Sequence, residues 1–367
     1  MKKILLSLVI LALLVAAVGC KSSEYPPVKS TDEEAEVIMT LSLDGEKYEV
    51  KYELYRALFL SNRQSVDGGD ESVWSGADSE AYISRINEII TKKASDIYAV
   101  LHLAERLNID PYSNEVEEQI DEYIRISVEG NEADVIGFGG DYDAYLAFLD
   151  EQGLNYSVQE LLIRYSVLLE KIDEYYKGTE DEALGAIAGE YEYSEEDVRA
   201  YYFSDGCARV LHAYLQEGVT TDTYVRMGRI RDEMMAAEGD LAVALCIINN
   251  TSVTPTDLIK NKELCGIVVG KNTLSEDYSD YSRAVFALLP GETSEIIEVN
   301  DGERGYYVIY KADKTEEHLN RCYDDVVSSY LDDLVGKELA SIAKSLADGA
   351  KSEDAYSKIN HRSILSK

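Results

Sequence analysis

The sequence predicts an α+β protein in which helical segments enclose a segment that mixes helices and strands. Three observations lead to this fold class. Apolar side chains recur at helical spacing through most of the first half, strand-like stretches appear between about residues 203 and 313, and a long helical stripe returns near the carboxyl end. The order of helical, mixed and helical segments indicates an insertion, after which the last helix packs on the first domain.

The predicted helical domain opens with a β-hairpin. Residues 37–43 and 46–50 flank Asp44 and Gly45, a dipeptide that favours tight hairpin turns. Residues 64–76 are expected to form a loop. Helices are then predicted over residues 79–107, 114–128, 142–149 and 157–176, the last opened by a capping box at Ser157 and Glu160.

The mixed segment follows a short helix that a second capping pattern opens at Ser194 and Asp197. Strands are predicted where apolar and aromatic residues form short runs, and helices where they recur at helical spacing. The predicted order is strand 208–215, helix 223–238, helix or strand 241–248, strand 267–269, helix 281–288, strand 305–311 and a long helix 316–346.

The charge of the chain excludes several classes of protein. Its 367 residues contain 35 Lys and Arg against 70 Asp and Glu, a formal net charge of −35. We therefore expect no nucleic-acid partner and no attachment to anionic lipid through a basic surface. The chain also contains 28 Tyr but only 5 Phe and 1 Trp, an aromatic composition that suits surfaces both apolar and wet.

The first twenty residues have the features of an export signal. Two lysines precede the apolar run 4–18, which is too short for an ordinary membrane span and ends in Ala17-Val18-Gly19-Cys20. This ending resembles the lipobox of bacterial lipoproteins, which implies removal of residues 1–19 and a diacylglycerol on Cys20. An ordinary cleaved signal peptide followed by an incidental cysteine is the alternative. Removing residues 1–19 takes the formal charge from −35 to −37.

A lipid on Cys20 would place the protein at the extracytoplasmic face of the bacterial cell membrane. Residues 20–36 are polar, contain two prolines and lack periodicity, so they are predicted to be a tether. Outside the cytoplasm the four remaining cysteines permit disulfides in three pairings, and free buried thiols are equally compatible. Neither cysteine nor histidine spacing indicates a metal, and no cofactor is expected. These cysteines are Cys207, Cys246, Cys265 and Cys322.

Four stretches of the mature chain carry a family resemblance. They are Tyr193–Tyr202, Ala208–His212, Ala284–Ser294 and Gly305–Lys311. Together with the order of segments, they resemble the PrsA-like and SurA-like extracytoplasmic foldases. The resemblance implies a mostly helical SurA-like chaperone domain, residues 37–200 plus 315–367. It also implies an inserted parvulin-like α+β domain, residues 203–313, with a small antiparallel sheet and flanking helices.

The resemblance also implies where a site would lie. In parvulins, two histidines on adjacent central strands and a nearby Cys or Asp form a hydrogen-bonded floor. His212 matches the first histidine and Tyr307 stands at the position of the second, so these are the candidate catalytic residues. The candidate substrate-binding residues are Leu274, Tyr281 and Phe286. Without the resemblance, a histidine on an apolar strand is more often a hydrogen-bonded core residue, and with it the structural and active-site roles of His212 fit the sequence equally.

The function implied is that of a membrane-anchored extracytoplasmic foldase or chaperone for secreted proteins. Its partners would be unfolded or nascent secreted polypeptides, and a homodimer is left open. Peptidyl-prolyl cis-trans isomerase activity is also left open, because the second histidine is replaced and no Cys or Asp occurs at residues 249–252. A catalytically inactive parvulin-fold chaperone or scaffold is the alternative. A solute-binding lipoprotein would need two lobes of alternating strands and helices.

Overall fold

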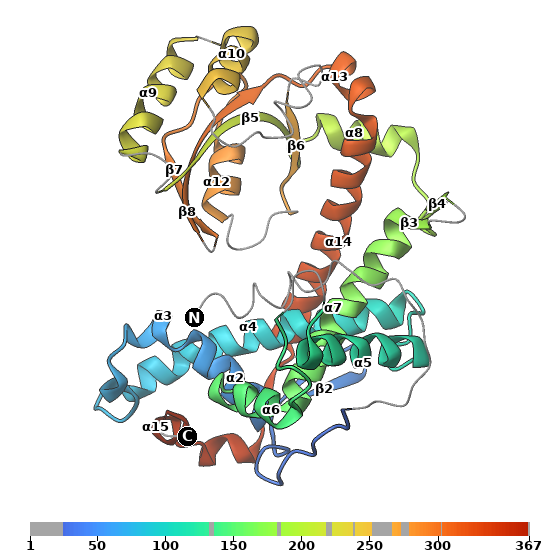
Figure 1. Ribbon diagram of the computed structural model, residues 1–367, viewed down its shortest axis with the longest axis vertical. Helices are drawn as coiled ribbons and strands as arrows, with labels where there is room; N and C mark the ends of the chain where they lie inside the picture. Colours follow the sequence, from blue (N-terminus) through green and yellow to red (C-terminus); the bar gives the residue numbers. More distant parts are fainter. Residues whose placement is uncertain are drawn as a thin grey trace. The chain divides into compact units, whose positions relative to one another are not determined.

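The structure is a computed structural model that describes residues 25–131, 136–181, 185–217, 222–237, 239–251, 266–272, 279–301 and 303–365. The chain forms two compact units (Figure 1). Unit 1 contains Met1–Glu174 and Glu338–Lys367, and unit 2 contains Tyr175–Lys337. The predicted signal segment and Cys20 lie outside the described residues. In the part of the chain that is described, no helix has the length and apolar character needed to cross a membrane.

A small antiparallel sheet in unit 1 confirms the predicted hairpin. Strand β1 (Val37–Leu43) pairs with β2 (Glu46–Lys51), and the turn between them places Asp44 and Gly45 at positive φ. Both turn residues adopt the backbone region that this hairpin type requires. The short strand β9 (Lys351–Ser352) pairs with the other edge of β1, so a segment near the carboxyl end completes the sheet.

The remaining elements of unit 1 are helical, and their apolar faces form its core. Ser113 caps α5 through the backbone N–H of Val116. The predicted capping box at Ser157 is wrong, because Asn155 accepts the N–H of Val158 at the start of α7. The elements are α2 (Tyr52–Asn62), α3 (Gln64–Asp67), η2 (Glu71–Trp74), α4 (Ser79–Arg106), α5 (Asn114–Glu129), α6 (Tyr142–Glu151), α7 (Tyr156–Lys177), η4 (Asp354–Lys358) and α15 (His361–Ile364).

Unit 2 is built on a four-stranded antiparallel sheet of order β6-β5-β8-β7. Its strands are β5 (Cys207–Gln216), β6 (Ile267–Gly270), β7 (Ile297–Asp301) and β8 (Glu303–Ala312). The helices α9 (Thr223–Ala236) and α10 (Leu241–Thr251) cover one face, and α12 (Ser279–Ala287) covers the other (Figure 1). Residues 241–248, for which the sequence left helix and strand open, are therefore helical.

Period-two alternation assigns the side chains of the central strands to these two faces. Leu211, Ala213 and Leu215 of β5 join the apolar cluster under α9 and α10, together with Tyr306 and Val308 of β8. The intervening residues of both strands point toward α12. A shift of one residue in either strand would exchange the two faces.

The other elements of unit 2 differ from the prediction in two places. Residues 178–190 contain the unpredicted hairpin β3 (Gly178–Asp181) and β4 (Gly185–Ala188). The predicted helix 316–346 is interrupted at Cys322, whose backbone (φ −120°, ψ 35°) is not helical, and so forms α13 (Glu316–Arg321) and α14 (Tyr323–Asp348). The capping box at Ser194 and Asp197 is confirmed at the start of α8 (Glu195–Phe203).

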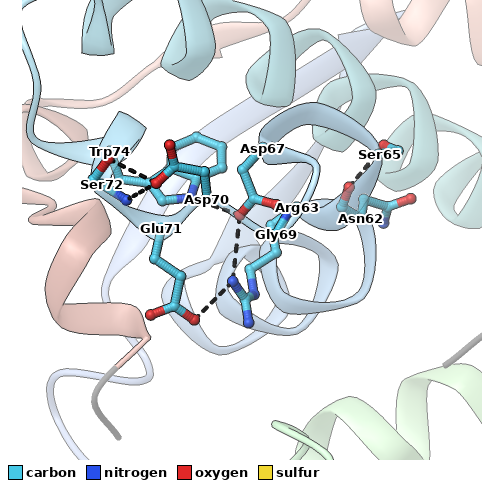
Figure 2. Close-up of polar contacts among 9 residues, drawn as sticks. All are labelled: Asn62, Arg63, Ser65, Asp67, Gly69, Asp70, Glu71, Ser72 and Trp74. Carbon is cyan, nitrogen blue, oxygen red and sulfur yellow. Dashed lines mark hydrogen bonds and ion pairs between the residues drawn. The ribbon is translucent and has the colours of Figure 1, made fainter.

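The predicted loop 64–76 contains two short helices organised by one buried carboxylate (Figure 2). Asp67 Oδ2 accepts the indole N–H of Trp74 at 2.9 Å and lies 3.3 Å from Arg63 Nη1. Its second oxygen accepts the backbone N–H of Gly69 at 2.8 Å. The loop prediction is therefore wrong in part, because Asp67 supplies hydrogen-bond acceptors that order this segment.

We expect Asp67→Ala to destabilise unit 1 by about 3 kcal/mol, because Arg63 and the Trp74 indole would lose a buried partner. Asp70→Ala is the matched control: it removes an exposed cap of η2 and should cost about 1 kcal/mol. Urea unfolding followed by the fluorescence of Trp74, the single tryptophan of the chain, measures both. Equal losses for the two variants would contradict the central role of Asp67.

Candidate functional site

The candidate site lies on the α12 face of the unit 2 sheet. His212 of β5 pairs with Ile309 of β8, and Tyr214 pairs with Tyr307. Because residues two apart in a strand share a face, His212, Tyr214 and Tyr307 all point toward α12. The two candidate catalytic positions thus occupy adjacent central strands. Their diagonal relation across an antiparallel pair brings large rings into contact.

Helix α12 adds a fourth ring to this group. The Tyr281 hydroxyl and Nδ1 of His212 form a hydrogen bond of 2.7 Å. The Tyr307 ring packs edge-on against both of them, with centroids 5.1 Å from His212 and 5.1 Å from Tyr281. Tyr214 lies 4.6 Å from Tyr307. We call His212, Tyr214, Tyr281 and Tyr307 the His212 cluster; Tyr281 is buried and the other three are half-buried.

Lys311 fixes the end of α12 against β8. Its ammonium donates to the carbonyl oxygens of Val285 and Leu288, at 3.1 and 2.8 Å, where the last turn of the helix has no backbone partner for them. Desolvation lowers the pKa of Lys311. The predicted pocket residue Phe286 lies beside this contact, with its ring centroid 5.7 Å from the ammonium. Phe286 thus belongs to the same apolar face as the His212 cluster.

The stretch that precedes β7 has a structural role. Gly291, at φ +86°, donates its N–H to Lys311 O at 2.7 Å, and Lys311 N–H donates to Glu292 O at 3.0 Å. The Ser294 hydroxyl oxygen accepts the N–H of Ile309 at 2.9 Å. These bonds fix the stretch from Gly291 to Ser294 against the backbone of β8. The positive φ explains a glycine at position 291.

The His212 cluster carries no charge at neutral pH. Desolvation lowers the pKa of His212 to about 4, so its imidazole is neutral. A neutral imidazole offers one N–H donor and one acceptor, and one of its nitrogens is already paired with Tyr281. Within the described residues, no group of three or more His, Cys, Asp or Glu could hold a metal ion. The cluster can therefore offer apolar contact and neutral hydrogen bonds to a ligand.

The structure does not bring every predicted residue to this face. Leu274 lies outside the described residues. Helix α10, near which the third parvulin group was expected, packs on the opposite face through Ala244 and Ile248, and Cys246 is exposed. Tyr214 was not predicted as a site residue, although its position two residues after His212 could have identified it.

The cysteines do not form a site in the described part of the chain. Cys207 and Cys322 are buried free thiols and Cys246 is an exposed one. Burial raises the pKa of Cys322 to about 11, and its sulfur lies 3.2 Å from Nδ1 of His318. Cys265 lies outside the described residues.

Comparison with known proteins gives only remote likenesses. No protein-family model matches the chain, and no curated protein matches its sequence. Solved structures of the foldase PrsA resemble it: that of Streptococcus pneumoniae at 14% identity over 87% of this chain and 97% of that one, with a TM-score of 0.28. The Lactococcus lactis structure is 13% identical over 90% of this chain and 98% of that one, with a TM-score of 0.24. The Bacillus subtilis structure is 15% identical over 86% of this chain and 93% of that one, with a TM-score of 0.23. With identities and TM-scores this low, the likeness assigns no function to this chain.

Acid should destabilise the protein through its buried histidines. Desolvation lowers the folded-state pKa of His212, His318 and His361 to about 4, below the value of about 6.5 in an unfolded chain. Their contribution to stability is complete above pH 6.5 and is lost as the pH falls toward 4, by about 1.4 kcal/mol per pKa unit of difference. NMR titration of the imidazoles and urea unfolding at several pH values measure this.

His212→Gln tests the share of that loss which belongs to His212. The variant cannot protonate at this position, so its unfolding free energy should fall less steeply than that of the wild type between pH 6.5 and 4. An imidazole of His212 that titrates near pH 6.5 in the folded protein would contradict the assignment.

Proposed function

We propose that this chain is a lipid-anchored extracytoplasmic foldase that binds proline-containing segments of unfolded secreted polypeptides over the His212 cluster. Three features support the proposal. The leader resembles a lipobox, the segments occur in the order of PrsA-like foldases, and the two candidate catalytic positions lie on adjacent central strands. The observation that carries it is the contact of His212, Tyr281 and Tyr307 on one half-buried face.

The chemistry of prolyl isomerisation suits such a face. Rotation about a peptide bond has a barrier of about 18–20 kcal/mol because resonance stabilises the planar amide. The twisted amide has less charge separation than the planar one, so weakly polar surroundings favour it. Uncatalysed X–Pro bonds isomerise over tens of seconds or longer. Aromatic rings can hold the proline ring, while a neutral imidazole and phenol hydroxyls supply hydrogen bonds without charge.

Tyr307 can take the role that the resemblance gives to a second histidine. A phenol hydroxyl both donates and accepts a hydrogen bond, as a neutral imidazole does with its two nitrogens. The Tyr307 ring contacts His212 directly, so a hydroxyl at this position borders the same surface. Because isomerisation transfers no proton to the enzyme, the group at this position need only donate or accept a hydrogen bond.

A catalytically inactive chaperone or scaffold is the second candidate. The arrangement of α10 favours it, because this helix covers the face opposite to His212 and supplies no Cys or Asp to the His212 cluster from its described side chains. A solute-binding lipoprotein is less well supported. The described strands pair antiparallel throughout, whereas such a protein needs lobes of alternating strands and helices.

A chromogenic X–Pro peptide assay on the mature chain tests catalysis. We expect the wild type to accelerate isomerisation by at least about tenfold, His212→Ala to lose most of that acceleration, and Tyr307→His to retain it. Tyr307→Phe should reduce the rate, because it removes the hydroxyl. Tyr306→Phe is the matched control, since the neighbouring tyrosine belongs to the opposite face of the same strand.

Equal isomerisation rates with and without the wild-type protein would disprove the catalytic part of the proposal. Suppression of the aggregation of an unfolded polypeptide, measured in parallel by light scattering, would then support the inactive chaperone. Loss of both activities would disprove the foldase function itself.

A further inference from the structure

The first described residues, which the sequence predicts to be part of a tether, are held against unit 1. The Tyr25 ring packs on the Tyr142 ring of α6 at 5.3 Å, and its hydroxyl donates to Glu129 Oε1 at 3.0 Å. The Tyr142 hydroxyl donates in turn to the carbonyl oxygen of Pro26 at 2.7 Å. These reciprocal contacts fix the point at which the chain joins the body of unit 1.

Further contacts continue along the same segment. Ser30 donates to Glu53, and its oxygen lies 2.9 Å from the Ser157 hydroxyl. Nearer β1, the carbonyl oxygen of Glu36 accepts the N–H of Tyr52 at 2.8 Å. A segment with such contacts along its length cannot act as a free spacer, so the effective tether ends at Tyr25.

The remaining connection to the lipidated residue is short. Four residues, Lys21 to Glu24, separate Cys20 from Tyr25. A fully extended chain advances about 3.5 Å per residue, so Tyr25 lies at most about 18 Å from Cys20. A diacylglycerol on Cys20 would therefore hold the Tyr25 end of unit 1 at the membrane surface.

That end of unit 1 carries a partly exposed, mainly aromatic surface, which we call the α6 patch: the exposed Ile136 and Phe148 and the half-buried Tyr25, Phe138 and Tyr142. Ring contacts of 5.3–6.2 Å connect its aromatic members, partly through the buried Tyr145. Ile136 is 99% exposed and Phe148 is 42% exposed. Tyrosines with an apolar body and a polar tip, beside exposed apolar side chains, are typical of residues at a membrane–water interface.

We propose that the α6 patch contacts the lipid headgroup region of the membrane to which the protein is anchored. The inference rests on the lipidation of Cys20 that the proposed function includes. The short connection supplies the proximity, and the exposed Ile136 and Phe148 supply the apolar contact. Asp141 and Asp143 beside the patch are exposed carboxylates, which anionic headgroups repel. The patch therefore fits zwitterionic headgroups better than anionic ones, and the difference is largest at low salt, where charges are least screened.

Tryptophan quenching in vesicles tests this contact. Lipidated Phe148→Trp protein is reconstituted in phosphatidylcholine vesicles that contain brominated lipid. The wild type, measured in the same way, corrects for the emission of the buried Trp74. We expect the new tryptophan to lose at least about half of its emission. Tyr112→Trp is the matched control, because Tyr112 is 62% exposed. Tyr112 precedes α5, whose 16 residues span about 24 Å before the patch begins. The tryptophan of this variant should therefore keep its emission.

The length of the connection provides a second test that leaves the folded body unchanged. An insertion of about twelve Gly and Ser residues after Glu24 lets the body move away from the surface, so quenching of Phe148→Trp should fall toward that of the control. Phosphatidylglycerol vesicles at low salt should also reduce it. The unlipidated Cys20→Ser protein should show no quenching.

Each remaining outcome would overturn the inference. Protein that floats with the vesicles but shows no quenching of Phe148→Trp would disprove the contact while leaving the anchor intact. A blue shift of this tryptophan when unfolded polypeptide is added to Cys20→Ser protein, without quenching in the anchored form, would identify the patch as a polypeptide site. Protein that does not float with vesicles would disprove the anchor of the proposed function, and with it the inference.

Discussion

A hydrogen bond between a histidine and a tyrosine hydroxyl recurs throughout this protein, and both units depend on it. His102 pairs with Tyr48 at 2.9 Å and His361 with Tyr55 at 2.8 Å in unit 1. In unit 2, His318 pairs with Tyr202 at 2.8 Å and His212 with Tyr281 at 2.7 Å. The chain contains four histidines, so each of them has this partner. A phenol hydroxyl can donate or accept, and it therefore satisfies either neutral tautomer without adding charge.

These pairs also explain part of the excess of tyrosine over phenylalanine. Each pair joins elements far apart in the sequence; the bond to His361, for example, holds α15 against α2. Phenylalanine would fill the same volume but leave the imidazole without its partner, and an unsatisfied buried polar group costs about 1–3 kcal/mol. Desolvation lowers the pKa of His212, His318 and His361 to about 4, so the pairs that these three form add no charge at neutral pH.

The recurrence of the pair means that the bond to Tyr281 alone does not distinguish His212 from a structural histidine. Its surroundings do distinguish it. His102, His318 and His361 are 3–6% exposed, whereas His212 is only half-buried and borders Tyr307, which is also half-buried. The His212 cluster therefore keeps part of its surface exposed, whereas the imidazoles of His102, His318 and His361 are enclosed by the core.

Local patterns were sufficient to predict the features that depend on local chemistry. A strand-like apolar run predicted β5, alternation predicted β8, and the order of hydroxyl and carboxylate predicted the cap at Ser194. The nearness of His212 and Tyr307 was implied by the family resemblance and not by these patterns. The rest depends on contacts between distant residues. Strand β9 consists of two residues that pair with β1 across the sequence, and Tyr25 is held by Tyr142 and Glu129. Neither contact leaves a periodic signal in its own segment.

The presence of His212 and three tyrosines, with no carboxylate among them, narrows the chemistry that the His212 cluster could perform. General acid–base catalysis needs a group whose pKa lies near the working pH, and His212, with a pKa of about 4, does not meet that condition near neutral pH. Isomerisation of an X–Pro bond makes no such demand, because it breaks no covalent bond and needs only a surface that favours the twisted amide. A surface of neutral rings and hydroxyls keeps this property across the pH range in which His212 stays neutral. Tyrosine at position 307 is thus compatible with isomerisation of an X–Pro bond.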